Sequence, residues 1–137
     1  MQAEKLNHAS GKRVPLLVKI APDLDEFAIE QIAQTLIKTE MDGVIATNTT
    51  LDRDSVAGHK HASEAGGLSG AVLCQKSLDI TAALSTALNG KLPIVGVGGI
   101  SNAQDAKNRF EAGASLLQVY SSFIYQGPQL IKDLVNA

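Results

Sequence analysis

The sequence predicts an α/β fold of four parallel βα units, which corresponds to the C-terminal half of a (β/α)8 TIM barrel. Four short apolar runs alternate with amphipathic stretches at near-regular spacing, a pattern typical of parallel βαβ units. Polar or glycine residues follow these runs, as they do around the mouth of a barrel. A complete barrel needs about 250 residues. The chain has 137 residues, so we expect about half of one.

The first βα unit begins with the apolar run Leu16–Ile20, which is expected to form a strand buried on both faces. Asp25 is placed to cap the helix that follows. Asp42 and Gly43 then turn the chain into a second buried strand, Val44–Thr47. The apolar residues of the intervening helix share one face, at positions Ile29, Ile32, Ala33, Leu36 and Ile37.

A polar, glycine-rich stretch from Asn48 to Gly70 separates the second strand from the helix of its unit. It is long for a βα connection, and loops of this length are usually functional or disordered. Helical periodicity returns between Leu73 and Leu88, and the pair Asn89-Gly90 ends that helix. We therefore expect a long loop at the mouth of the barrel.

The last two units repeat the strand–helix order. Pro93–Val97 is the third strand, and Ser101 is expected to cap a helix over residues 102–112. Ser115–Val119 is the fourth strand, and Pro128 opens a final amphipathic helix. In a barrel, the last two strand ends and the amides of the helices after them commonly form a phosphate site. The order therefore predicts a phosphorylated ligand and places these units in the second half of a barrel.

A four-stranded doubly wound sheet of the flavodoxin type is the alternative, and periodicity alone does not exclude it. That fold carries helices on both faces and binds ligands where the strand order reverses. The residues at the strand ends favour the barrel, because they would converge on a single mouth there. They are Lys19, Thr47, Asn48, Thr49, Gly98, Gly99, Tyr120 and Ser121.

Composition narrows the class of protein. The net charge is −2 and the basic residues are scattered, which argues against a nucleic-acid partner. The single cysteine, Cys74, excludes an internal disulfide framework and suits a reducing compartment. No apolar run approaches the roughly 20 residues that span a bilayer. Residues 1–13 are polar and expected to fray, so we assign 14–137 to the barrel half and expect the chain itself to be soluble.

Five sequence blocks together resemble the class 2, quinone-linked dihydroorotate dehydrogenases. The resemblance runs from about Val14 to the C-terminus, and five blocks in unbroken order are far more specific than any one of them. Class 1 enzymes of the same family carry different residues at the lysine and Asn-Thr-Thr positions, which favours class 2. The blocks are Val18–Leu24, Asp42–Asp52, Gly66–Gly70, Gly96–Ile100 and Gln118–Ser121.

The resemblance implies a flavoenzyme that uses FMN to oxidise (S)-dihydroorotate to orotate in de novo pyrimidine (UMP) biosynthesis. Electrons would pass to a quinone at the cytoplasmic side of the cell membrane, with membrane contacts made by an N-terminal part that nothing in this sequence matches. The alternatives are another FMN-binding TIM-barrel oxidoreductase and a non-catalytic half-barrel module that binds a phosphate ligand.

Lys19 is the firmest residue assignment. Its position in an apolar strand is costly for an unpaired ammonium, although a strand-end lysine that reaches solvent fits the sequence equally well. The resemblance assigns Lys19 to the flavin, where a fixed positive charge makes the ring a better hydride acceptor. It also assigns Thr47 to FMN, and Asn48 and Thr49 to the dihydroorotate or orotate.

The remaining FMN contacts implied by the resemblance are glycines and a phosphate-binding pair. Gly70 and Gly99 would let the cofactor approach the backbone, and Tyr120 and Ser121 would contact its phosphate. The proton-abstracting base of class 2 enzymes is a serine on a loop of the first barrel half, which nothing here matches. We therefore expect no catalytic base in this chain and no turnover by the chain alone.

Other polar residues are interpreted structurally. His59 and His61 are expected to be surface loop residues because no further ligand completes a metal site nearby. Cys74 is expected to be a small core residue rather than a base, and Gly96 a structural glycine. A half barrel also leaves two unpaired edge strands and exposed apolar faces, which predicts a dimer or larger assembly.

Overall fold

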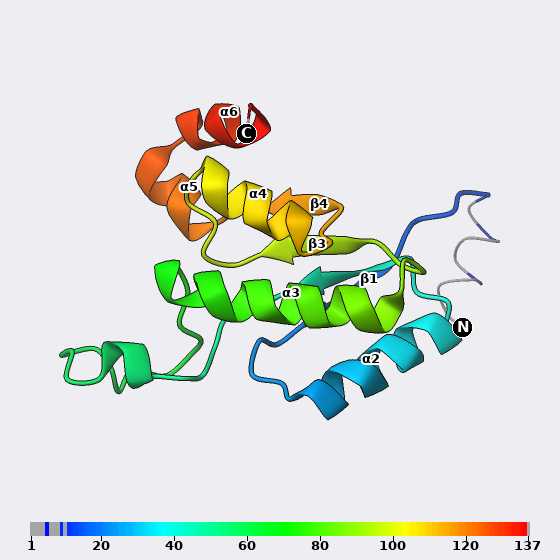
Figure 1. The fold of residues 1–137 in the computed structure, drawn as a ribbon, viewed down its shortest axis with the longest axis horizontal. Helices are drawn as coiled ribbons and strands as arrows, with labels where there is room; N and C mark the ends of the chain where they lie inside the picture. The colour runs from blue at the N-terminus through cyan, green and yellow to red at the C-terminus, as the bar shows by residue number, and fades with distance from the viewer. Residues whose placement is uncertain (1–4, 6–8, 10, 137) are drawn as a thin grey trace.

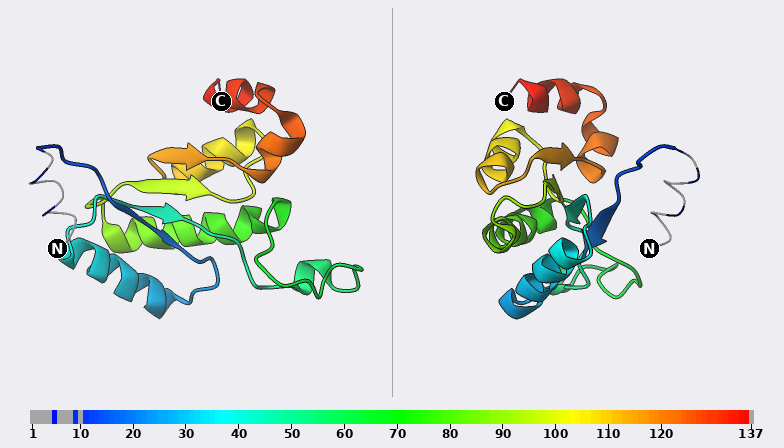
Figure 2. Two further views of the ribbon diagram at one scale, coloured as in Figure 1. Left: turned by 180° about the vertical axis from the view of Figure 1, so that it is seen from behind. Right: turned by 90° about the vertical axis from the view of Figure 1, so that its right-hand side faces the viewer.

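The structure, a computed structural model, describes Lys5, Ala9 and residues 11–136. A four-stranded parallel sheet lies at its centre, and helices α2, α3 and α4 cover one face of that sheet (Figures 1 and 2). Most of the predicted N-terminal segment 1–13 lies outside the described residues. The strands are β1 (Leu17–Ile20), β2 (Gly43–Ala46), β3 (Ile94–Val97) and β4 (Leu116–Gln118).

The helices follow the strands in the predicted order. The long loop after β2 contains a short 3₁₀ turn, η1 (Asp54–Val56), and a second one, η2 (Ala71–Leu73), leads into α3. None of the helices in the described residues combines the length and apolar content needed to cross a bilayer. The helices are α2 (Glu26–Lys38), α3 (Cys74–Leu88), α4 (Ala103–Glu111), α5 (Ser121–Gln126) and α6 (Gln129–Val135).

The strand order distinguishes the barrel from the doubly wound alternative. The spatial order is β1-β2-β3-β4, identical to the chain order, and every neighbouring pair is parallel. A doubly wound sheet reverses its order at the ligand crevice, and this sheet has no reversal. The prediction of four βα units of a (β/α)8 barrel is confirmed.

The hydrophobic core lies between the sheet and the helices that cover it. Val44 and Ala46 of β2 and Leu84 of α3 are each 0% exposed, and Leu36 of α2 completes the contact between the two helices. Paired residues in register face the same side, so the row that contains Lys19 lies on the opposite face. The apolar periodicity of α2 and α3 therefore identified the buried face correctly.

The expectation that the strand Leu16–Ile20 is buried on both faces is wrong. Only Ile20 is buried, whereas Leu16, Val18 and Lys19 are exposed. Lys19 faces the side of the sheet that α2, α3 and α4 leave uncovered in the described residues (Figure 2). Val18 pairs with Val44 on the covered side, but it lies in β1, an edge strand of the sheet. An apolar run shows that a strand could be buried on both faces, but it is buried only where another element covers it.

The helix ends test the predicted caps. Asp25 caps α2 as expected, since its carboxylate accepts the Ala28 N–H at 2.7 Å. The predicted Ser101 cap is wrong, because Asn102 is the N-cap of α4 and accepts the Asp105 N–H at 2.9 Å. Ser101 instead donates its own N–H and hydroxyl to the Asp105 carboxylate.

Helix α5 begins at Ser121, within the segment Val119–Ser122 that the sequence predicts to run from a strand into a helix start, but its extent was not predicted. It has six residues, fewer than two turns, which is too short for a helical period to show in the sequence. Its sequence lies directly after the strand end that carries Tyr120. The helix therefore directs the chain away from the sheet immediately past the predicted phosphate contacts (Figure 1).

Candidate functional site

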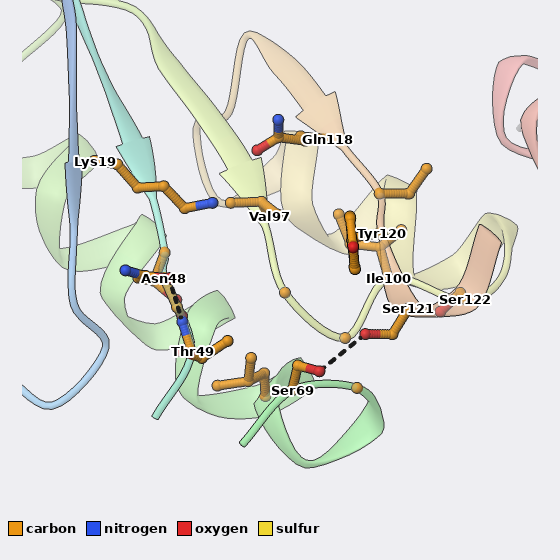
Figure 3. Close-up of a pocket in the computed structure, with 16 residues that line it drawn as sticks. Lys19, Asn48, Thr49, Ser69, Val97, Ile100, Gln118, Tyr120, Ser121 and Ser122 are labelled. Atoms are coloured by element: carbon orange, nitrogen blue, oxygen red, sulfur yellow. Dashed lines mark hydrogen bonds between the residues drawn. The ribbon is translucent and has the colours of Figure 1, made fainter. Parts of the chain in front are cut away.

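A cavity of about 260 Å³ lies at the carboxyl ends of the strands (Figure 3). Every residue predicted to bind cofactor or substrate lines it, although these residues come from opposite ends of the sequence. They are Lys19, Thr47, Asn48, Thr49, Gly70, Gly99, Tyr120 and Ser121. Convergence on one mouth is the geometric expectation for a barrel.

Lys19 supplies the positive charge of the cavity wall. Its side chain extends from β1 across the sheet toward Val97 of β3 (Figure 3). Within the described part of the chain, Lys19 makes no hydrogen bond or ion pair, so its ammonium is available to a ligand. An unshared ammonium at a concave site favours a ligand that carries or develops negative charge.

The segment Thr47–Thr49 is held by backbone bonds to both neighbouring strands. The Thr47 N–H donates to the Val97 carbonyl at 2.8 Å, and the Asn48 N–H donates to the Ile20 carbonyl at 2.7 Å. The Ala46–Thr47 peptide bond is cis. Thr47 is buried, while the Asn48 side-chain oxygen accepts the Thr49 N–H at 2.9 Å. These bonds fix the backbone from which the Asn48 and Thr49 side chains reach the cavity.

The long loop returns onto this segment. Thr50 and Leu68 form an antiparallel bridge, with N–H to carbonyl distances of 3.1 and 2.8 Å. At Gly67, a Cβ atom would stand 1.8 Å from the Thr49 hydroxyl oxygen, so only glycine permits this contact. The bridge closes the loop and brings Ser69 and Gly70 to the cavity.

An ion-pair cluster ties the start of the loop to α3. Lys76 Nζ lies 2.8 Å from Asp23 Oδ1 and 3.1 Å from Asp52 Oδ2. Asp23 also accepts from the Thr50 hydroxyl at 2.5 Å and the Leu51 N–H at 2.9 Å. Burial alone would raise the pKa of Asp23, but the donors around it outweigh burial and lower the pKa to about 2. The cluster anchors the loop, so Asp23 and Asp52 have a structural role.

Free backbone N–H groups gather where β3 and β4 end. In the part of the chain that the structure describes, the N–H groups of Gly98, Gly99, Tyr120 and Ser121 donate to no acceptor. The Ser121 hydroxyl lies beside them, 3.1 Å from that of Ser69 (Figure 3). Clustered backbone donors with a hydroxyl are the usual means of binding a phosphate group.

The glycines of the turn after β3 line the cavity and also pack against α3. A Cβ atom on Gly99 would lie 2.4 Å from backbone atoms of Cys74, and φ of Gly99 is +71°. Glycine is needed at this position to pack the turn against α3. Gly96 is structural as predicted, since its Cβ would lie 2.4 Å from the Arg109 side chain.

Several lining residues were not identified from the sequence. Ser69, Gln118 and Ser122 line the cavity, and Leu73 forms part of its wall. Gln118 could have been found from strand alternation, since it pairs with Val97 and faces the same side of the sheet. Ser69, Leu73 and Ser122 lie beyond the strand ends, where the sequence pattern does not indicate which way a side chain points.

The residues interpreted structurally lie outside the cavity lining. His61 contacts Glu64 at 2.5 Å, and both side chains are exposed at the tip of the long loop. No group of three or more potential metal ligands forms among the described residues. Cys74 is only half-buried rather than a core residue, because its side chain lies between Gly99 and Asp105. Burial, reinforced by Asp105, raises the pKa of its thiol.

The fold and the cavity together define a class of protein: an α/β protein built from units of a (β/α)8 barrel, with a cavity at the carboxyl ends of its parallel strands. Residues 2–137 match the family model described as dihydroorotate dehydrogenase, and the chain belongs to this family.

Curated relatives support the family assignment. The chain is 56% identical over 127 residues to a dihydroorotate dehydrogenase (quinone) from Pseudoalteromonas atlantica, covering 93% of this chain and 38% of that protein. It is 57% identical over 126 residues to the protein of the same name from a Shewanella species, covering 92% of this chain and 37% of the relative. The chain thus spans little more than a third of the length of these relatives.

Two solved structures share the fold. The crystal structure of dihydroorotate dehydrogenase from Eimeria tenella in complex with ferulenol superposes with a TM-score of 0.85 at 39% identity, covering 91% of this chain and 33% of that one. The ligand-free form from the same organism gives 0.85 at 40% identity, covering 92% and 35%. The described units therefore correspond to about a third of a larger barrel protein.

Proposed function

We propose that this chain forms the FMN- and dihydroorotate-binding part of a quinone-dependent dihydroorotate dehydrogenase. The reaction is the oxidation of (S)-dihydroorotate to orotate in de novo pyrimidine biosynthesis, with electrons passed to a quinone at the cytoplasmic side of the cell membrane. The observation that carries the proposal is the convergence of the predicted cofactor and substrate residues on one cavity.

The residues present fit FMN. Free N–H groups at the ends of β3 and β4 suit its phosphate, and the unpaired Lys19 suits an electron-accepting ring. A Cβ on Gly70 would meet no protein atom within 4 Å, so this glycine leaves open space on the cavity side. When bound, FMN supplies the hydride acceptor of the reaction. The protein contributes Lys19, Thr47, Gly70, Gly99, Tyr120 and Ser121 as its contacts.

Asn48 and Thr49 position the substrate in this proposal. Their backbone is fixed through Thr47 and the loop bridge, and their side chains offer donors and acceptors to a planar, polar heterocycle. Holding such a ring against the cofactor lowers the barrier through orientation. The serine base that takes the substrate proton is assigned to the part of the relatives that this chain does not span.

Reconstitution tests the proposal directly. The chain is purified alone and together with a polypeptide that supplies the remaining part of the Pseudoalteromonas atlantica relative. We expect flavin absorbance and dihydroorotate-dependent reduction of a soluble quinone from the pair, and no turnover from the chain alone. Turnover by the chain alone would contradict the assignment of the base to the other part.

Lys19→Met sharpens this test. Loss of the fixed charge is expected to lower kcat of the reconstituted pair by about a hundredfold, the effect typical of removing one preorganised electrostatic contact. Lys107→Met is the matched control, because Lys107 is an exposed lysine of α4 outside the cavity lining. Equal kcat values for the two variants would exclude a role for Lys19 in the reaction.

The same experiments separate the alternatives. Another FMN-binding TIM-barrel oxidoreductase would bind FMN in the reconstituted pair but would not oxidise dihydroorotate. A non-catalytic phosphate-binding module would bind FMN tightly as the isolated chain, and adding the second polypeptide would produce no turnover. The free N–H groups suit any phosphate monoester, so dihydroorotate oxidation is the discriminating measurement.

A further inference from the structure

Arg109 of α4 is a buried cation directly beneath the turn that follows β3. It is 1% exposed and has the largest side chain among the fully buried residues. Its Nη2 donates to the Gly98 carbonyl at 2.9 Å and to the Cys74 carbonyl at 3.2 Å. Its Nη1 donates to the Ser77 hydroxyl at 2.5 Å. One guanidinium thus connects the cavity turn to the start of α3.

The charge of Arg109 has no close counter-charge. No described carboxylate lies within 4.0 Å of it, and its Nε has no hydrogen-bond partner in that part of the chain. Asp105 and Asp79 act on it only from a longer range, and burial lowers the pKa of the guanidinium. Buried charges in proteins are usually paired, so an isolated one indicates a role beyond packing.

Peptide geometry links this charge to the cavity. The carbonyl of Gly98 and the N–H of Gly99 belong to one trans peptide plane and point in opposite directions. Because the carbonyl is held by Arg109, the N–H of Gly99 is directed away from the buried guanidinium. Gly99 lines the cavity, and its N–H is among the free donors. A cation at the carbonyl also polarises the peptide and strengthens its N–H as a donor.

Other contacts keep the turn in place without Arg109. The Ser77 hydroxyl donates to the Val97 carbonyl at 2.6 Å, and Gly99 packs on the Cys74 backbone. The turn is therefore attached to α3 by both uncharged and charged contacts. A neutral, hydrogen-bonding replacement of Arg109 separates the effect of the charge from the effect of the attachment.

We propose that Arg109 is a positioning residue for phosphate recognition: it aims the Gly99 N–H into the cavity and supplies the buried charge that favours a dianionic phosphate ester over its neutral alcohol. This inference deepens the proposed function and rests on it only where FMN is taken as the ester. Arg109 does not line the cavity, so it acts through the turn.

The test compares FMN with riboflavin, which has the same ring system but no phosphate. Dissociation constants for both are measured by flavin fluorescence on the chain reconstituted with the second polypeptide, for Arg109→Gln, Arg109→Lys and Lys107→Met. Arg109→Gln, which keeps a donor but no charge, is expected to reduce the preference for FMN about tenfold. Arg109→Lys keeps the charge and is expected to retain most of the preference. Lys107→Met removes an exposed charge from the same helix and is expected to leave it unchanged.

Three results would overturn the inference: equal binding of FMN and riboflavin by the unsubstituted pair, binding of neither, or an unchanged preference in Arg109→Gln. If Arg109→Gln does not fold, the amide resonance of Gly99 in the unsubstituted pair decides instead. It should shift on addition of inorganic phosphate or FMN and remain in place with riboflavin. Failure of dihydroorotate oxidation with an intact FMN preference would refute the proposed function and leave the role of Arg109 standing.

Discussion

The two faces of the sheet carry different tasks. On the helix-covered face, Val44, Ala46 and Leu84 are completely excluded from solvent. On the opposite face, Lys19 reaches the cavity and Leu116 of β4 is 62% exposed. Burial of apolar surface stabilises a fold by about 25 cal/mol per Å². One face therefore holds the fold together, while the edge of the other presents the groups that we propose to bind ligands.

The largest expected effect comes from the covered face. Leu84→Ala should lower the free energy of unfolding by about 2–5 kcal/mol, because it removes buried apolar atoms and leaves a cavity. Leu116→Ala, on the open face, should cost less than about 1 kcal/mol. Urea denaturation followed by circular dichroism measures both. Similar losses for the two variants would contradict the division between the faces.

The open face is expected to promote self-association. Strands β1 and β4 are the edges of the sheet, and unpaired edges beside exposed apolar side chains favour pairing with a second copy. Leu116→Glu should weaken this association about tenfold or more, since it would place an unpaired charge in the contact. Sedimentation velocity over a concentration series measures the dissociation constant.

Phe27→Glu is the matched control for that experiment. Phe27 is 70% exposed, comparable with Leu116, but it lies on α2 rather than on the sheet. If both substitutions weaken association equally, general surface hydrophobicity is responsible and the open face has no special part. A stable monomer in the unsubstituted chain would refute self-association altogether.

The contrast between the faces also explains which features were predictable. The strand order, the α2 and α3 stripes and the Asp25 cap follow from local patterns, and all were predicted from the sequence. The exposure of Val18 was not, because an apolar run does not show whether another element covers it. The extent of helix α5 was not predicted, because six residues are too few to show a helical period.

The cavity, too, could be predicted only in part from the sequence. Resemblance to a family identified residues at four strand ends, and the fold brought all of them to one cavity. Arg109 was missed because a basic residue within an amphipathic helix normally reaches solvent. Its burial depends on Gly96, which makes room for the side chain, and on hydroxyl groups of α3. Such a site exists only once three elements are packed together.

The smallest expected effect is on stability and concerns Asp23, which connects the start of the long loop to Lys76 of α3. Its pKa is about 2 in the folded chain against 3.8 for an unperturbed aspartate, so the ionised form is stabilised by folding. This contribution is fully present above pH 4 or so and is lost as the pH falls toward 2. After allowance for solvent screening at a side chain 32% exposed, we expect about 1 kcal/mol.

Urea denaturation of the unsubstituted chain and Asp23→Asn at several pH values between 2 and 6 isolates that contribution. The stability difference between the two proteins should shrink as the pH falls, because protonated aspartic acid and asparagine are both neutral. Lys76→Met should also reduce the acid-dependent loss, since Lys76 is one of the donors that lower the pKa of Asp23. A stability difference between the two proteins that stays constant with pH would show that Asp23 acts through packing and neutral hydrogen bonds. The loop would then be attached to α3, on the covered face, without a contribution from the charge of Asp23.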